Sequence, residues 1–92
     1  MFFKQLRIED EGCLNAFRSF PCVACGHPPP SDPAHITSVG AGGGDTEKNL
    51  MSLCRFHHRL QHDQGWKFMA AEFRRVELAL KNKKRFDILE RD

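Results

Sequence analysis

Two pairs of candidate metal ligands, about thirty residues apart, constrain the fold of this 92-residue chain most strongly. Cys22 and Cys25 are separated by two residues and followed by a glycine, which can adopt the left-handed conformation that a tight turn requires. Cys54 and His57 repeat this spacing. The sequence therefore predicts a structural zinc site with three cysteines and one histidine, for which His27 is the alternative fourth ligand. Because so short a chain buries little apolar surface, a bound metal would add stability that its core cannot supply.

The cysteines would also permit disulfides or a redox pair. However, the first residues turn charged almost at once, unlike a signal peptide, and no apolar run is long enough to span a bilayer. We therefore expect a reducing cytosol, where clustered Cys and His favour a metal over disulfides. A redox Cys-x-x-Cys pair would be followed by a helix, which Pro28, Pro29 and Pro30 prevent here. Cys13 is expected to be a packed free thiol.

His58 and His62 form a second pair of candidate ligands. They are four residues apart, so in a helix they share one face. Adjacent residues of a helix point about 100° apart, so His57 and His58 cannot easily bind the same ion. The sequence therefore predicts two metal sites back to back.

The segments around these ligands predict a small α+β domain. Residues 8–20 are expected to form a helix with Leu14 and Phe17 as its buried contacts. Residues 31–39 predict a strand by their β-branched content and alternation, and residues 49–53 predict its return strand.

The glycine-rich residues 40–45 predict a flexible hairpin connection between these strands. A phosphate-binding loop is the alternative, but the segment lacks the Lys-Ser/Thr ending of a P-loop. With the following helix, which carries His58 and His62, the strands form a ββα unit.

From Gly65 the sequence predicts one helix with a single apolar stripe that forms the core, and residues 86–89 predict a short helix packed back on the domain. The stripe consists of Trp66, Met69, Ala70, Phe73, Val76 and Leu80. The basic residues Lys83, Lys84 and Arg85 are expected to belong to a solvated face.

In their order along the chain these motifs resemble the zinc-ribbon branch of the HNH endonucleases. More narrowly, the chain is similar to small HNH proteins of phages and prophages, which are often encoded near DNA-packaging genes. The resemblance covers about residues 18–68. It rests on Cys22-x-x-Cys25, Ala34-His35-Ile36, a glycine-rich loop, Asn49-Leu50, Leu53-Cys54-x-x-His57-His58 and His62.

The resemblance implies a zinc-binding ββα-metal (His-Me finger) domain with flanking helices. We expect one domain over residues 1–92, with its ββα core at about 20–65 and a helical C-terminal part at 66–92. The implied activity is a metal-dependent DNA endonuclease or nickase that acts in the cytoplasm of a bacterial host and leaves 5′-phosphate and 3′-hydroxyl ends.

The resemblance also implies a role for each matching residue. His35 would be the general base that takes a proton from the attacking water, and Asn49 would orient His35 through a hydrogen bond and steady the loop. His58 and His62 would hold one Mg²⁺ or Mn²⁺ ion against the scissile phosphate. Many family members place a third ligand immediately before the base, where this chain has alanine, so Asp32 or water would complete the metal site.

The net charge of +2 and the pI near 8.5 permit a nucleic-acid partner without requiring one. Four basic residues are expected to contact the DNA backbone without reading its sequence, namely Arg59, Lys67, Arg74 and Arg75. The alternative function is a non-catalytic zinc-ribbon module that binds DNA or a phage packaging protein, which the alanine before His35 supports. A zinc-stabilised protein-interaction domain is a third interpretation.

Overall fold

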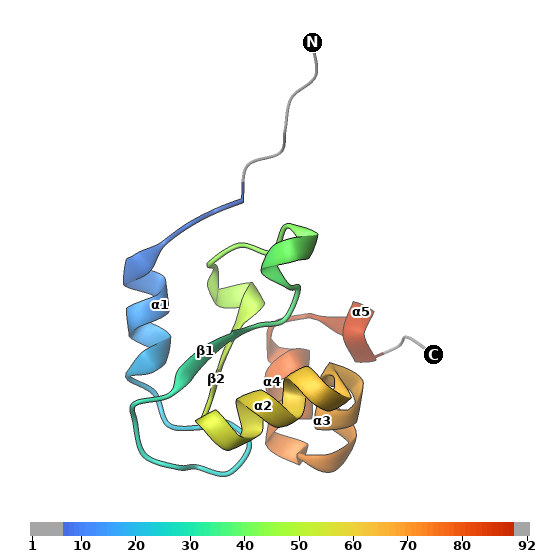
Figure 1. Ribbon diagram of the computed structural model, residues 1–92. Coiled ribbons are helices and arrows are strands. Elements are labelled where there is room, and N and C mark those ends of the chain that lie inside the picture. The colour runs from blue at the N-terminus through green and yellow to red at the C-terminus, as the bar shows by residue number, and fades with distance from the viewer. Residues whose placement is uncertain (1–6, 90–92) are drawn as a thin grey trace.

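A two-stranded antiparallel sheet lies between helices in the computed structural model, which describes residues 7–89 (Figure 1). Strand β1 (Asp32–His35) pairs with β2 (Leu50–Leu53), so that His35 lies opposite Leu50. Both strands are found inside the predicted segments. The first is shorter than residues 31–39 because the chain leaves the sheet after His35 and turns at Val39–Ala41.

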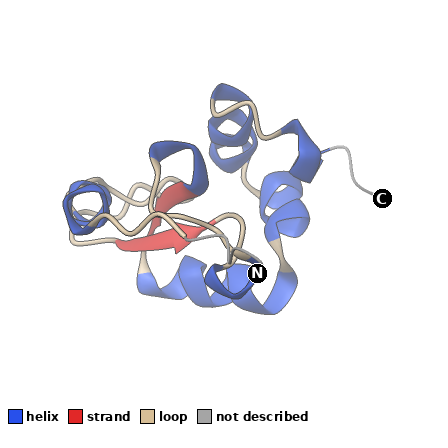
Figure 2. Ribbon diagram, turned by 90° about the horizontal axis from the view of Figure 1, so that it is seen from above, coloured by secondary structure: helices blue, strands red, loops and turns tan. Residues whose placement is uncertain are grey.

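Helices flank the sheet on two sides, which establishes the predicted α+β class. In Figure 1 and in the view from above in Figure 2, α1 lies on one side of the strands and the C-terminal helices lie on the other. The helices are α1 (Glu11–Arg18), α2 (Arg55–Gln64), α3 (Trp66–Glu72), α4 (Arg74–Asn82) and α5 (Phe86–Leu89). None of the helices in residues 7–89 has the length and apolar character needed to cross a membrane.

Helix α1 is shorter than the predicted residues 8–20. It begins after Asp10, whose side chain accepts a hydrogen bond from the Cys13 backbone N–H at 3.0 Å. Leu14 and Phe17 are only half-buried, so the prediction that they are core residues is wrong. Cys13 is a half-buried thiol whose pKa is raised, chiefly by burial and then by the charge of Asp10.

The apolar stripe from Trp66 to Leu80 does supply much of the core, but not from one helix. Phe73 has an extended backbone (φ −125°, ψ 107°), which ends α3 and starts α4. The turn brings the Phe73 ring edge-on to the ring of His57, with centroids 4.9 Å apart. Fully or nearly fully buried side chains in this core are Cys22, Ala34, Ile36, Met51, Leu53, Trp66, Met69, Ala70, Val76 and Leu80.

The first part of the glycine-rich connection, Gly40 to Gly42, is exposed, whereas its second part is packed. It contains two short 3₁₀ turns, Val39–Ala41 and Glu47–Asn49, and Gly43 and Asp45 within it are buried. A Cβ atom on Gly43 would lie 1.8 Å from the carbonyl oxygen of Thr37, so only glycine fits there. The connection is therefore a built part of the domain.

Arg85 holds this connection from the C-terminal side. Its side chain is 9% exposed and donates to Asn49 Oδ1 at 3.0 Å and to Thr37 Oγ1 at 2.8 Å. The carboxylate of Asp87 is its third acceptor, and together the three acceptors compensate for the burial of the guanidinium. The prediction that Arg85 belongs to a solvated basic tail is therefore wrong.

Candidate metal centre and active-site cleft

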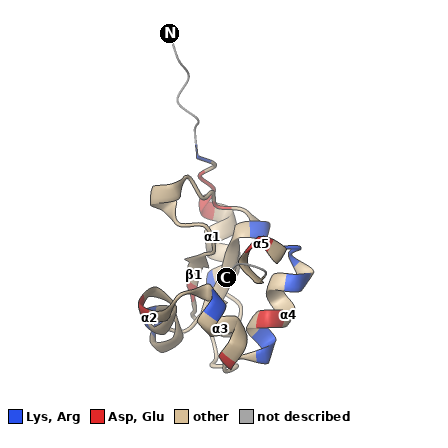
Figure 3. Cartoon of the chain, turned by 90° about the vertical axis from the view of Figure 1, so that its right-hand side faces the viewer, with Lys and Arg blue, Asp and Glu red and all other residues tan. Residues whose placement is uncertain are grey.

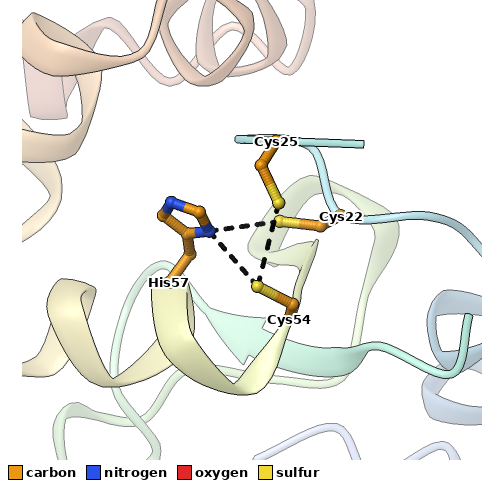
Figure 4. Close-up of side chains that lie close together, drawn as sticks. All are labelled: Cys22, Cys25, Cys54 and His57. Carbon is orange, nitrogen blue, oxygen red and sulfur yellow. Dashed lines mark hydrogen bonds between the residues drawn. The ribbon is translucent and has the colours of Figure 1, made fainter. Parts of the chain in front are cut away.

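The four predicted zinc ligands come together in the structure (Figure 4). The ligand atoms of Cys22, Cys25, Cys54 and His57 all lie within 4.8 Å of one another. His57 Nδ1 is 3.2 Å from Cys54 Sγ and 3.8 Å from Cys22 Sγ, and the Sγ atoms of Cys25 and Cys54 are 3.9 Å apart. A tetrahedral zinc with these ligand types has ligand-to-ligand separations of roughly 3.5–3.8 Å. The group therefore fits a structural metal such as zinc.

Backbone hydrogen bonds shape the first half of this centre. The N–H of Gly26 donates to the carbonyl of Cys22 at 2.8 Å, and Gly26 has φ 78°, as the sequence requires of this turn. The N–H of Val23 donates to the carbonyl of Ser52 at 2.9 Å, which fastens the turn to β2. Cys22 and Cys25 are thereby held beside the end of that strand.

The second half of the centre comes from the junction of β2 and α2. Cys54 is the N-cap of α2 and His57 lies in its first turn, so a residue spacing of three places both ligands on the same side. His57 is buried, and its ring is nearly perpendicular to the rings of Phe56 and Phe73, at centroid distances of 5.0 and 4.9 Å. Burial lowers the pKa of His57 and so favours the neutral imidazole that binds a metal.

The cysteines differ in their tendency to ionise. Burial opposes ionisation of Cys22, but backbone N–H groups around its sulfur, including that of Cys54, outweigh burial and lower its pKa. The pKa of Cys25 is raised, first by burial and also by the neighbouring Cys22 thiol.

His27, the alternative ligand, is exposed and its Nδ1 lies 3.0 Å from the carbonyl of Pro28, outside the cluster. The structure thus selects His57.

A second candidate feature is a cleft of about 380 Å³, whose lining residue His58 directly follows His57 of this centre. His35 from the end of β1 and His58 and His62 from α2 all line it. The rings of His58 and His62 lie at a centroid distance of 4.9 Å and are tilted by 48° to each other. Three predicted site residues thus share one cleft, although His35 lies 23 residues before His58 in the sequence.

Asp32 is bonded to His58 instead of standing free as a third ligand. Its Oδ2 lies 3.0 Å from His58 Nδ1 and accepts a hydrogen bond from Arg55 Nε, also at 3.0 Å. Burial acts to raise the pKa of Asp32, but these two partners lower it overall. A carboxylate on Nδ1 fixes the ring of His58 and leaves Nε2 to face an ion. The structure thus shows Asp32 as a partner of His58, and Asp32 as a direct metal ligand stays a prediction.

Asn49 steadies the connection between the strands, as predicted, but its side chain does not bond to His35. Among the described residues, Asn49 Nδ2 donates to the carbonyls of Thr37 and Gly44 at 3.0 Å each, and Oδ1 accepts from the Thr37 N–H and from Arg85. The side chain is saturated by these partners. The prediction that Asn49 orients the base is wrong for this reason.

The partner of His35 is Asp45, which the sequence reasoning missed. His35 Nε2 lies 2.7 Å from Asp45 Oδ1, and Asp45 is 3% exposed. The hydrogen bond from His35, followed by the backbone N–H of Asp10 and the guanidinium of Arg7, outweighs burial and lowers the pKa of Asp45 to about 2. The one signal in the sequence is an acid inside a glycine-rich segment, a pattern that is also typical of an exposed loop.

The four predicted DNA-contacting residues are all exposed, but they do not form one patch. Arg59 shares α2 with the histidine pair, whereas Lys67 belongs to α3 and Arg74 and Arg75 to α4. In Figure 3 the basic segments of α3 and α4 are interspersed with acidic ones. Arg75 lines a separate, mainly apolar hollow of about 450 Å³ that shares no lining residue with the cleft.

Comparison of the chain with known protein families, with curated proteins and with solved structures returned no match.

Proposed function

We propose that this protein is a metal-dependent DNA endonuclease or nickase with a ββα-metal site. The observation that carries the proposal is the common cleft of His35, His58 and His62, each supplied by the element that the HNH resemblance requires. The adjoining cysteine and histidine cluster supports it, since a structural zinc would fix the start of α2 and hence the histidine pair. The cytoplasm of a bacterial host is the location that accords with this activity.

His35 is suited to remove a proton from water. Imidazole changes its protonation near neutral pH, and the 21% exposure of the His35 side chain gives it access to the cleft. In the proposed hydrolysis, the water oxygen forms a bond to phosphorus, its proton passes to His35, and the bond from phosphorus to the 3′ oxygen breaks. The 3′ oxygen takes a proton from solvent, leaving 3′-hydroxyl and 5′-phosphate ends.

His58 and His62 are suited to hold a divalent ion. Their rings are 4.9 Å apart, and the contact of Asp32 with His58 Nδ1 leaves the opposite nitrogen for the ion. Bound Mg²⁺ or Mn²⁺ would stabilise charge on the phosphate and on the departing oxygen. Mg²⁺ usually keeps several waters, so two protein ligands from this chain are compatible with it.

The DNA partner would be held mainly through its phosphates. Arg59 lies on the same helix as the histidine pair and is exposed, as is Arg55 at the helix start. Such contacts bind without reading sequence and weaken with salt. A domain of this size offers little surface for base contacts, so specificity would have to come from a partner such as a phage packaging protein.

The test is cleavage of supercoiled plasmid by the purified protein with Mn²⁺, with Mg²⁺ and without added divalent ion. His35→Ala removes the base, and His27→Ala is the matched control, because His27 is exposed and lies outside both sites. We expect metal-dependent relaxed or linear product from the wild type and from His27→Ala, and none from His35→Ala. Absence of product with every ion, from protein that retains zinc, would reject the nuclease in favour of a non-catalytic zinc module.

A further inference from the structure

The carboxylate of Asp45 has three hydrogen-bond partners among the described residues, His35, Arg7 and Asp10. Its Oδ1 accepts from Arg7 at 2.8 Å and its Oδ2 from the Asp10 backbone N–H at 3.0 Å. Its own N–H donates to the carbonyl of Ile8 at 2.8 Å. The segment before α1 and the connection between the strands are thereby joined at Asp45, which is in direct contact with His35.

These partners decide which nitrogen of His35 carries the proton. A guanidinium and a backbone N–H can only donate, so the Asp45 carboxylate is an acceptor toward both. With its pKa lowered to about 2, Asp45 is ionised at neutral pH and has no proton to give to His35. His35 Nε2 must therefore be the donor in the 2.7 Å contact, and the ring's free electron pair is on Nδ1.

The backbone of His35 is fixed as firmly as its ring. It is paired with Leu50 in the sheet, and its carbonyl accepts a hydrogen bond from Trp66 Nε1 at 3.3 Å. Nδ1 has no hydrogen-bond partner among residues 7–89, and His35 lines the cleft that holds His58 and His62. The imidazole is thus held in place at one nitrogen and available for chemistry at the other.

We propose that Asp45 is the positioning residue for His35, holding the proton on Nε2 so that Nδ1 is the atom that accepts the proton from water. The role of Nδ1 as the base rests on the proposed nuclease function. The location of the proton on Nε2 follows from the contact with Asp45 alone. Asp45 takes the orienting role that the family resemblance assigns to Asn49. It also stabilises the imidazolium that forms when Nδ1 is protonated.

The proton position is measured directly by ¹⁵N NMR of the histidine rings in the zinc-loaded protein, without DNA or added divalent ion. His58 is an internal control with the opposite arrangement, because its Nδ1 faces the carboxylate of Asp32. We expect the proton of neutral His35 on Nε2 and that of neutral His58 on Nδ1. In Asp45→Ala, His35 should become a mixture of the two forms while the His58 signals stay unchanged.

Finding the His35 proton on Nδ1 in the wild type, or unchanged His35 signals in Asp45→Ala, would overturn the proposal. Plasmid cleavage is the second measurement, in which Asp45→Ala should lower kcat by roughly 100-fold and change KM less than about twofold. A loss confined to KM, or accompanied by loss of zinc, would show a structural role only. If the wild type cuts no DNA but the NMR result holds, the contact stands and the nuclease function fails.

Discussion

Substitution of Gly43 by alanine tests whether the connection between the strands is built as tightly as the structure indicates. The new Cβ would lie 1.8 Å from the Thr37 carbonyl oxygen and 2.8 Å from Asn49 Nδ2, so one of these groups must move by about 1 Å or more. That movement disturbs two hydrogen bonds between Asn49 and Thr37, of 2.7 and 3.0 Å. At about 1 kcal/mol for each bond and about 1–3 kcal/mol for overpacking, we expect a loss of roughly 4 kcal/mol in the free energy of unfolding.

The assay is urea unfolding followed by far-UV circular dichroism at constant zinc concentration. Gly40→Ala is the matched control, because no atom lies within 4 Å of its added Cβ and its φ is not left-handed. That variant should differ from the wild type by less than about 0.5 kcal/mol. If Gly43→Ala were as stable as Gly40→Ala, the close packing of the connection around Asn49 would be refuted.

Two further predictions concern the metal centre and the acid dependence of stability. Cys54→Ser should abolish tight zinc binding, measured by metal analysis after dialysis, and should also abolish the cooperative thermal unfolding transition. Cys13→Ser should retain both properties, because Cys13 lies outside the cluster. The pKa of Asp45 is about 2 in the folded protein and 3.8 ordinarily. This difference stabilises the folded state by about 2 kcal/mol at neutral pH, and the stabilisation is lost as the pH falls through the folded-state pKa. The difference in unfolding free energy between wild type and Asp45→Asn should therefore be about 2 kcal/mol at pH 7 and shrink below pH 4; a difference that does not change with pH would contradict the assignment.

The metal centre could be predicted from the sequence because its geometry is almost entirely local. Cys22 and Cys25 need only a tight turn, and Cys54 and His57 need only the first turn of a helix. Each pair is therefore set by its own spacing, and only the meeting of the two pairs depends on the fold. The face shared by His58 and His62 follows from the same local reasoning.

The residues that the sequence reasoning missed or misplaced all act across long separations. Asp45 is ten residues from His35, and Arg85 is thirty-six from Asn49. Nothing in the local pattern distinguishes them from exposed charges of a loop and a tail. The break at Phe73 cannot be predicted from the local pattern either, because the apolar spacing continues through it.

Helix α2 carries both Cys54 and His57 at its start and the cleft residues His58 and His62. A zinc site at the start of this helix would therefore affect the cleft although zinc would not line it. A zinc ion bound by Cys54 and His57 would tie the first turn of the helix to the Cys22 turn, and His58, about 100° further around the helix, meets Asp32 of β1. A ten-residue helix in isolation is only marginally stable in water, so the axis of α2 depends on these attachments. Four protein ligands leave zinc no open position for chemistry. Its contribution to the proposed activity is therefore to fix the angle at which His58 and His62 enter the cleft opposite His35.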